Sequence, residues 1–63
     1  MERKFKLEDA VRIVKDSYAD YGLRLGESGT VIALGMKHSG VFTYVVQVGR
    51  SEFRVYEPDL ETV

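Results

Sequence analysis

Residues 22–60 constrain the fold more than any other part of the chain, because glycines introduce one strand there and two alternating segments follow it closely. Gly22, Gly26 and Gly29 stand at intervals of four and three residues, and an apolar segment over residues 28–34 begins around the last of them. Glycine adopts positive φ without steric cost, so this spacing predicts tight turns immediately before a buried strand.

Residues 41–56 have the pattern of a β-hairpin. Apolar and polar side chains alternate with a period of two on both sides of Gly49, and residues 35–40 form the loop that leads into the hairpin. Polar side chains mark the face expected to meet solvent: Thr43, Gln47, Glu52 and Arg54. The opposite face is expected to point into the core: Tyr44, Val46, Val48, Phe53 and Val55.

Residues 7–21 permit two structures. Apolar residues recur there at spacings of four and three, as in an amphipathic helix: Leu7, Val11, Val14, Tyr18 and Tyr21. β-branched residues also cluster over 11–14, and Asp16 begins a turn signal, which together favour a short strand with Val11 and Ile13 inward. We expect the strand followed by a long loop, guided by the resemblance described below, and the helix is the alternative.

The last residues are expected to close the sheet. Pro58 fixes its own φ, so Glu57, Pro58 and Asp59 suit one turn of 3₁₀ helix that returns Leu60 to the core. Residues 61–63 then form a last short strand.

The length of the chain limits it to one domain over residues 1–63, with residues 1–6 as a flexible or edge N-terminal segment. Ordering each residue costs roughly 1.5 kcal/mol, which leaves no surplus for a second core and argues against a buried catalytic cleft. The chain has no Cys, so no disulfide or thiolate metal site stabilises the core. We therefore expect no enzymatic activity, no cofactor and no metal.

Charge and hydropathy indicate a cytoplasmic protein that does not enter membranes. The first seven residues include several charges and no apolar segment follows them, which argues against a signal peptide. No apolar run approaches the roughly 18 residues that span a bilayer. The net charge is -1 and the pI is near 5.7, whereas dedicated nucleic-acid domains have a pI above about 9.

Two short motifs and the order of the elements carry a family resemblance. The motifs are Gly26-Glu27-Ser28-Gly29-Thr30-Val31 and the closing Asp59-Leu60-Glu61. With them, the chain resembles an SH3-like (Src-homology-type) small β-barrel, most closely the stand-alone SH3-like proteins of bacteria and phages, and more distantly KOW-type domains. The resemblance implies an all-β, five-stranded barrel with a long first loop and a short 3₁₀ turn before the last strand.

The resemblance also bears on the ligand. Tyr18-Ala19-Asp20-Tyr21-Gly22 is loosely similar to the aromatic segment with which eukaryotic SH3 domains bind proline-rich peptides. The chain contains no Trp, however, so the central aromatic residue of that groove is missing. This absence argues against recognition of proline-rich peptides.

Tyrosines and arginines indicate a protein-recognition site, because interfaces are enriched in both. The first loop, residues 16–25, is polar and carries two tyrosines, which makes it the best candidate contact element. The predicted interface residues are Tyr18, Tyr21, Arg24, Arg54 and Tyr56. We expect a non-enzymatic module that binds another protein and, by the resemblance, serves as an accessory subunit or as a phage or mobile-element modulator of a host protein.

Other partners are alternatives. A homodimer or an added strand at the exposed edge of the last strand is open. Binding of RNA or DNA, in the manner of KOW-type domains, would use interleaved basic and aromatic residues: Arg12, Lys15, Arg24, Arg50 and Arg54 with Tyr18, Tyr21 and Tyr56. His38, the single imidazole, is expected to be a solvated loop residue and not a metal ligand or part of a catalytic relay.

Overall fold

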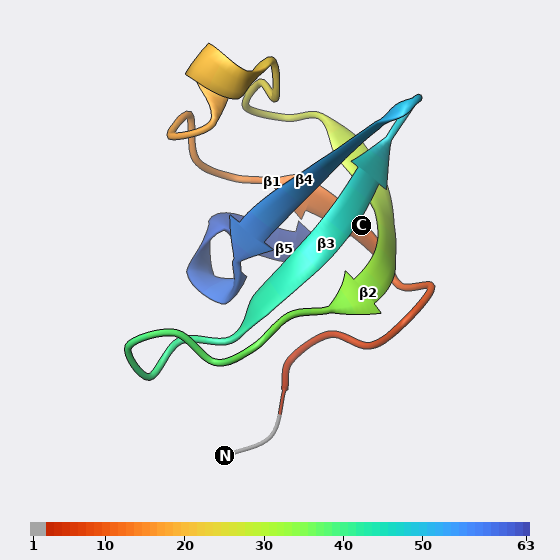
Figure 1. Ribbon diagram of the computed structural model, residues 1–63. Coiled ribbons are helices and arrows are strands. Elements are labelled where there is room, and N and C mark those ends of the chain that lie inside the picture. The colour runs from red at the N-terminus through yellow and green to blue at the C-terminus, as the bar shows by residue number, and fades with distance from the viewer. Residues whose placement is uncertain (1–2) are drawn as a thin grey trace.

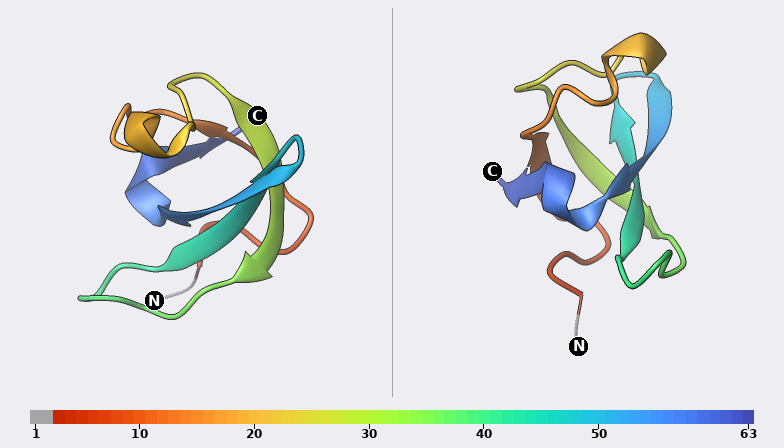
Figure 2. Two further views of the ribbon diagram at one scale, coloured as in Figure 1. Left: turned by 45° about the horizontal axis from the view of Figure 1, so that its top comes forward. Right: turned by 90° about the vertical axis from the view of Figure 1, so that its left-hand side faces the viewer.

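The computed structural model describes residues 3–63 and shows an all-β chain. The elements are β1 (Ala10–Ile13), η1 (Ala19–Tyr21), β2 (Ser28–Leu34), β3 (Thr43–Val48), β4 (Ser51–Tyr56), η2 (Glu57–Asp59) and β5 (Leu60–Thr62). The five strands form one antiparallel sheet in the order β4-β3-β2-β1-β5 (Figure 1). The sheet curls so that β5 faces β3 and β4 across the interior (Figure 2). The predicted all-β, five-stranded fold with a long first loop and a 3₁₀ turn before the last strand is confirmed.

Strand β1 decides between the two structures that residues 7–21 permit. Val11 and Ile13 are buried, as the strand predicts, and the helical alternative is wrong apart from the single 3₁₀ turn η1. Arg12 pairs with β2 on one side and with β5 on the other. These partners give the backbone of β1 the hydrogen bonds that a helix would have supplied internally.

The β3–β4 hairpin has the predicted register and most of the predicted inward face. Gly49 has a φ of 63° at the first central position of a two-residue loop, the place where a type II′ turn requires glycine. Tyr44, Val46 and Val55 are fully buried, and the remaining two residues of the predicted face, Val48 and Phe53, are partly buried against the core.

Thr43 corrects the predicted solvent-facing side of the hairpin. Its side chain is buried, whereas the alternation of polar residues placed it in solvent. The hydroxyl donates a hydrogen bond to the carbonyl oxygen of Met36 at 2.7 Å. A buried hydroxyl with a partner avoids most of the cost of desolvation, so a polar residue is tolerated here.

The N-terminal segment is the second correction. Residues 1–2 of the predicted flexible or edge segment lie outside the described residues, but Phe5 is buried in the core with its ring edge-on to that of Tyr44. The Arg3 guanidinium donates hydrogen bonds to the carbonyl oxygens of Thr43, at 3.0 Å, and Gly35. Residues 3–6 therefore belong to the packed domain.

The three glycines that were predicted to introduce β2 do not share one role. Gly22 and Gly26 have φ values of 93° and 91°, as the predicted turns require. Gly29 lies within β2, and its φ is not positive. A Cβ atom on Gly29 would stand 2.3 Å from the carbonyl oxygen of Gln47, so the absence of a side chain lets β2 and β3 approach.

We expect Gly29→Ala to lower the free energy of unfolding by about 2 to 3 kcal/mol, because the new methyl group meets backbone and forces the strands apart. Gly26→Ala is the matched control: it has open space but a positive φ, and it should cost only about 1 kcal/mol. Urea unfolding of the two variants measures both effects. Equal midpoints would show that β2 and β3 do not depend on the close approach at Gly29.

Candidate functional site

A groove of about 540 Å³ runs between the first loop and β4. These two walls are far apart in the sequence, and the fold brings them together. The groove is lined by Tyr18, Tyr21, Glu52, Phe53, Arg54 and Tyr56. Four of the five predicted interface residues thus lie around one hollow, and its volume is within the range of ligand-binding clefts.

Tyr18 serves the groove mainly as an anchor. Its side chain is 8% exposed and belongs to the hydrophobic core, which differs from the expectation of a surface aromatic residue. The hydroxyl accepts a hydrogen bond from the backbone N–H of Tyr56 at 3.0 Å and donates one to Oδ2 of Asp59 at 2.5 Å. Leu23 is fully buried as well. Tyr18 and Leu23 therefore fix the first loop, which was predicted to be a polar loop.

The anchored loop displays Tyr21 to solvent. Tyr21 ends the 3₁₀ turn η1 and is 75% exposed, while the following Gly22 adopts a left-handed conformation that reverses the chain. The backbone N–H of Leu23 then returns to the carbonyl of Tyr18 at 3.1 Å. Tyr21 on one wall and Tyr56, 42% exposed, on the other therefore give the groove two accessible aromatic rings.

The groove carries one charge of each sign. Glu52 and Arg54 are both exposed and lie two residues apart on β4, so their side chains project from the same face of the strand. Phe53 between them is partly buried and packs against the core. Arg24, the fifth predicted interface residue, is not among the lining residues, and its backbone N–H bonds to Oε1 of Glu27 at 3.1 Å.

A second hollow of about 350 Å³ shares two residues with the groove. It is lined by Met36, Lys37, His38, Thr43, Arg54 and Tyr56. The ring of His38 lies 6.2 Å from that of Tyr56, and no carboxylate from residues 3–63 lines this hollow. The sequence missed this contact between the loop over residues 35–40 and β4, because no periodicity or motif links them.

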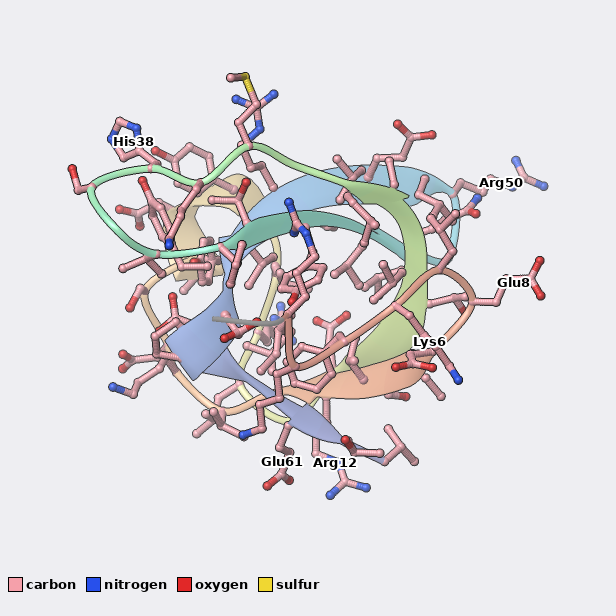
Figure 3. The ribbon with its side chains drawn as sticks, turned by 90° about the horizontal axis from the view of Figure 1, so that it is seen from below. Lys6, Glu8, Arg12, His38, Arg50 and Glu61 are labelled. Carbon is pink, nitrogen blue, oxygen red and sulfur yellow. The ribbon has the colours of Figure 1, made fainter. Side chains whose placement is uncertain are left out.

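The basic residues considered for nucleic-acid binding do not share one face. Arg12 pairs with Glu61 at 3.1 Å, and both side chains are about half exposed. Figure 3 shows this pair on the opposite side of the molecule from His38, with Arg50 projecting in a third direction from the hairpin tip. His38 is exposed on its loop, consistent with the expected solvated residue.

Burial in the core changes the acidity of two tyrosine hydroxyls. Burial, and then the hydrogen bond to Asp59, raise the pKa of Tyr18 from 10.0 to about 12, although the N–H from Tyr56 opposes this shift. Burial and the hydrogen bond to Glu57 also raise the pKa of Tyr44. Both hydroxyls therefore keep their protons, and remain donors, well above neutral pH.

No family model matches the chain, and comparisons with curated proteins and with solved structures find no match. Within residues 3–63, no three His, Cys, Asp or Glu side chains are grouped so that they could hold a metal ion. No helix in the same range is long and apolar enough to cross a membrane.

We expect Tyr18→Phe to lower the free energy of unfolding by about 1 to 3 kcal/mol, because it leaves the Tyr56 N–H and the Asp59 carboxylate without their partner. Tyr21→Phe changes an exposed ring in the same loop and should stay within about 0.5 kcal/mol of the wild type. Thermal or urea unfolding of both variants tests the difference. Equal stability of the two variants would contradict the anchoring role of Tyr18.

Alkaline titration provides a separate test. Because the pKa of Tyr18 is higher in the folded chain than its ordinary value of 10.0, the unfolded chain loses this proton first as the pH rises. The stabilisation is complete below pH 10 and is lost between pH 10 and about 12, by up to about 2 kcal/mol. Across this range, the free energy of unfolding should fall less steeply with pH for Tyr18→Phe than for wild type. Parallel curves for the two proteins would refute the raised pKa of Tyr18.

Proposed function

We propose that this protein is a non-enzymatic binding module that recognises another protein through the groove between the first loop and β4. The observation that carries the proposal is the pairing of exposed Tyr21 and Tyr56 on facing walls, with Phe53 partly buried between charged neighbours. Tyrosine, phenylalanine and arginine are the residues that interface centres favour. An aromatic hollow bordered by single charges suits a polypeptide with mixed side chains.

The chemistry of the groove supports binding without catalysis. General acid–base catalysis uses two titratable groups whose environments separate their pKa values. The charged groups of the groove, Glu52 and Arg54, are both exposed to solvent. The buried hydroxyl of Tyr18 is already engaged with Asp59 and Tyr56 and serves structure.

An SH3-like architecture is part of the proposal. The order of the strands, the long first loop and the turn η2 before β5 support it. By the resemblance to stand-alone proteins of bacteria and phages, the module would act in the cytoplasm. Its role there would be that of an accessory subunit or of a phage or mobile-element modulator of a host protein.

Nucleic-acid binding of the KOW type is the second candidate, favoured by the second hollow. Lys37, His38, Arg54 and Tyr56 line it with no carboxylate from residues 3–63, and basic side chains beside an aromatic ring suit a phosphate and a base. Binding of this kind weakens steeply with salt as counterions return to the phosphates, whereas an interface centred on tyrosines weakens little.

Affinity capture from an extract of the source cells, run with and without nuclease, tests the proposal. We expect the wild type to retain one protein in stoichiometric amount after nuclease treatment. Tyr21→Ala should lower the amount retained at least about tenfold, because truncating a central aromatic residue of an interface costs 1.4 kcal/mol or more. Leu7→Ala is the matched control, since Leu7 is also exposed and does not line the groove.

The outcomes separate the two candidates. Capture that disappears with nuclease would replace protein recognition by nucleic-acid binding. Capture that survives nuclease but is equal in Tyr21→Ala and Leu7→Ala would place the interface outside the groove. Both variants change exposed side chains, so both should keep the fold, and amide spectra check this directly.

A further inference from the structure

Strand β4 is an edge of the sheet, and the register of the hairpin determines which of its backbone groups face outward. The two-residue loop makes Val48 and Ser51 the first hydrogen-bonded pair, so Ser51, Phe53 and Val55 direct their N–H and C=O groups toward β3. Glu52 and Arg54, the residues in between, direct theirs away from the sheet.

Two contacts outside the hairpin agree with this assignment. The carbonyl of Thr43 accepts a hydrogen bond from Gly35 N–H at 2.9 Å on the β2 side, so Thr43 does not use its backbone groups on β4. The backbone N–H of Tyr56, which lies opposite Thr43, points outward and donates to the hydroxyl of Tyr18. Tyr56 thus shows the outward direction that Glu52 and Arg54 share.

The outward N–H and C=O groups of Glu52 and Arg54 have no hydrogen-bonding partner among residues 3–63. Both residues line the groove, whose opposite wall carries Tyr21. Unpaired backbone groups on an edge strand are a template for a further strand. We propose that the groove binds an extended segment of the partner protein as an antiparallel strand added to β4. This inference rests on the proposed function and specifies how the partner is held.

An added strand fits this site better than the alternatives. A polyproline II segment makes no ladder of backbone hydrogen bonds, so it would leave the outward groups of Glu52 and Arg54 unused. The loop with Tyr21 lies across the groove from β4, so the edge is enclosed on one side and accepts a single chain more readily than a second barrel. The other edge strand, β5, has only three residues.

The charges of β4 specify the partner segment. In an antiparallel pair, residues directly opposite each other place their side chains on the same face, and opposite charges there attract. The segment should therefore carry a carboxylate opposite Arg54 and, two residues later, a cation opposite Glu52. The residue between them lies opposite Phe53 and should be apolar.

The test uses capped synthetic peptides and amide exchange of the folded protein. The probe is Val-Glu-Val-Lys-Thr, whose Glu and Lys fall opposite Arg54 and Glu52, and the charge-reversed control is Val-Lys-Val-Glu-Thr. We expect the probe, added to millimolar concentration, to slow amide hydrogen exchange at Glu52 and Arg54 at least about tenfold. We expect the reversed peptide to bind about tenfold more weakly, which corresponds to 1.4 kcal/mol.

N-methylated peptides separate backbone pairing from contacts of side chains. Methylating the backbone nitrogen of the peptide's Glu removes a hydrogen bond to Arg54 and should weaken binding at least about tenfold. Methylating the central Val nitrogen, which would face solvent, should change affinity less than threefold. Equal losses from the two methylations, or no protection of Glu52 and Arg54 by the probe, would overturn strand addition.

The proposed function can survive that result. If a protein is still captured through Tyr21 while the peptides leave Glu52 and Arg54 exchanging as before, the groove recognises its partner by side chains and strand addition is wrong. If capture is also independent of Tyr21, both proposals fail. Fast exchange at these two amides in the free protein, beside slow exchange at Phe53 and Val55, is the expected starting state.

Discussion

The curled form of this small sheet depends on two tyrosine hydroxyls that donate hydrogen bonds to carboxylates of one turn, η2. Tyr44 bonds to Glu57 at the start of the turn and Tyr18 bonds to Asp59 at its end. Each hydroxyl also accepts a backbone N–H, so it is satisfied although buried. The chain has no Cys and therefore no covalent closure. These contacts join its N-terminal segment and first loop to β3, β4 and the turn η2 across the core.

The same contacts create the groove. Tyr18 is held by η2 and by β4, so the loop that follows it is fixed close to β4 while remaining outside the sheet. The chain then turns at Gly22, which leaves Tyr21 exposed on the far wall. Because the wall is anchored before any partner arrives, binding there would cost less conformational entropy than binding to a mobile loop.

The alternation of apolar and polar residues predicted the elements that neighbouring residues determine. Alternation over residues 41–56 predicted a hairpin. Residues 7–21 also fitted the spacing of a helix, although the strand was favoured, and pairing with two distant strands makes them a strand and a loop. The interface residues were chosen for their chemistry, and four of them meet in the groove. The burial of Tyr18 escaped prediction because its partner, Asp59, is 41 positions away, and Phe5 escaped because an isolated aromatic residue among charges has no period.

The protection of the β4 edge links stability to recognition. An open edge invites pairing between molecules, and folded proteins limit it with charged side chains and with covering loops. Here Glu52 and Arg54 supply the charges, the first loop faces the edge, and the Tyr18 hydroxyl takes the N–H of Tyr56. These features oppose edge-to-edge pairing of whole molecules, yet two residues of β4 inside the groove keep backbone groups that have no partner among residues 3–63. The charges and the loop that protect the edge against other sheets therefore also favour a single extended chain as the ligand.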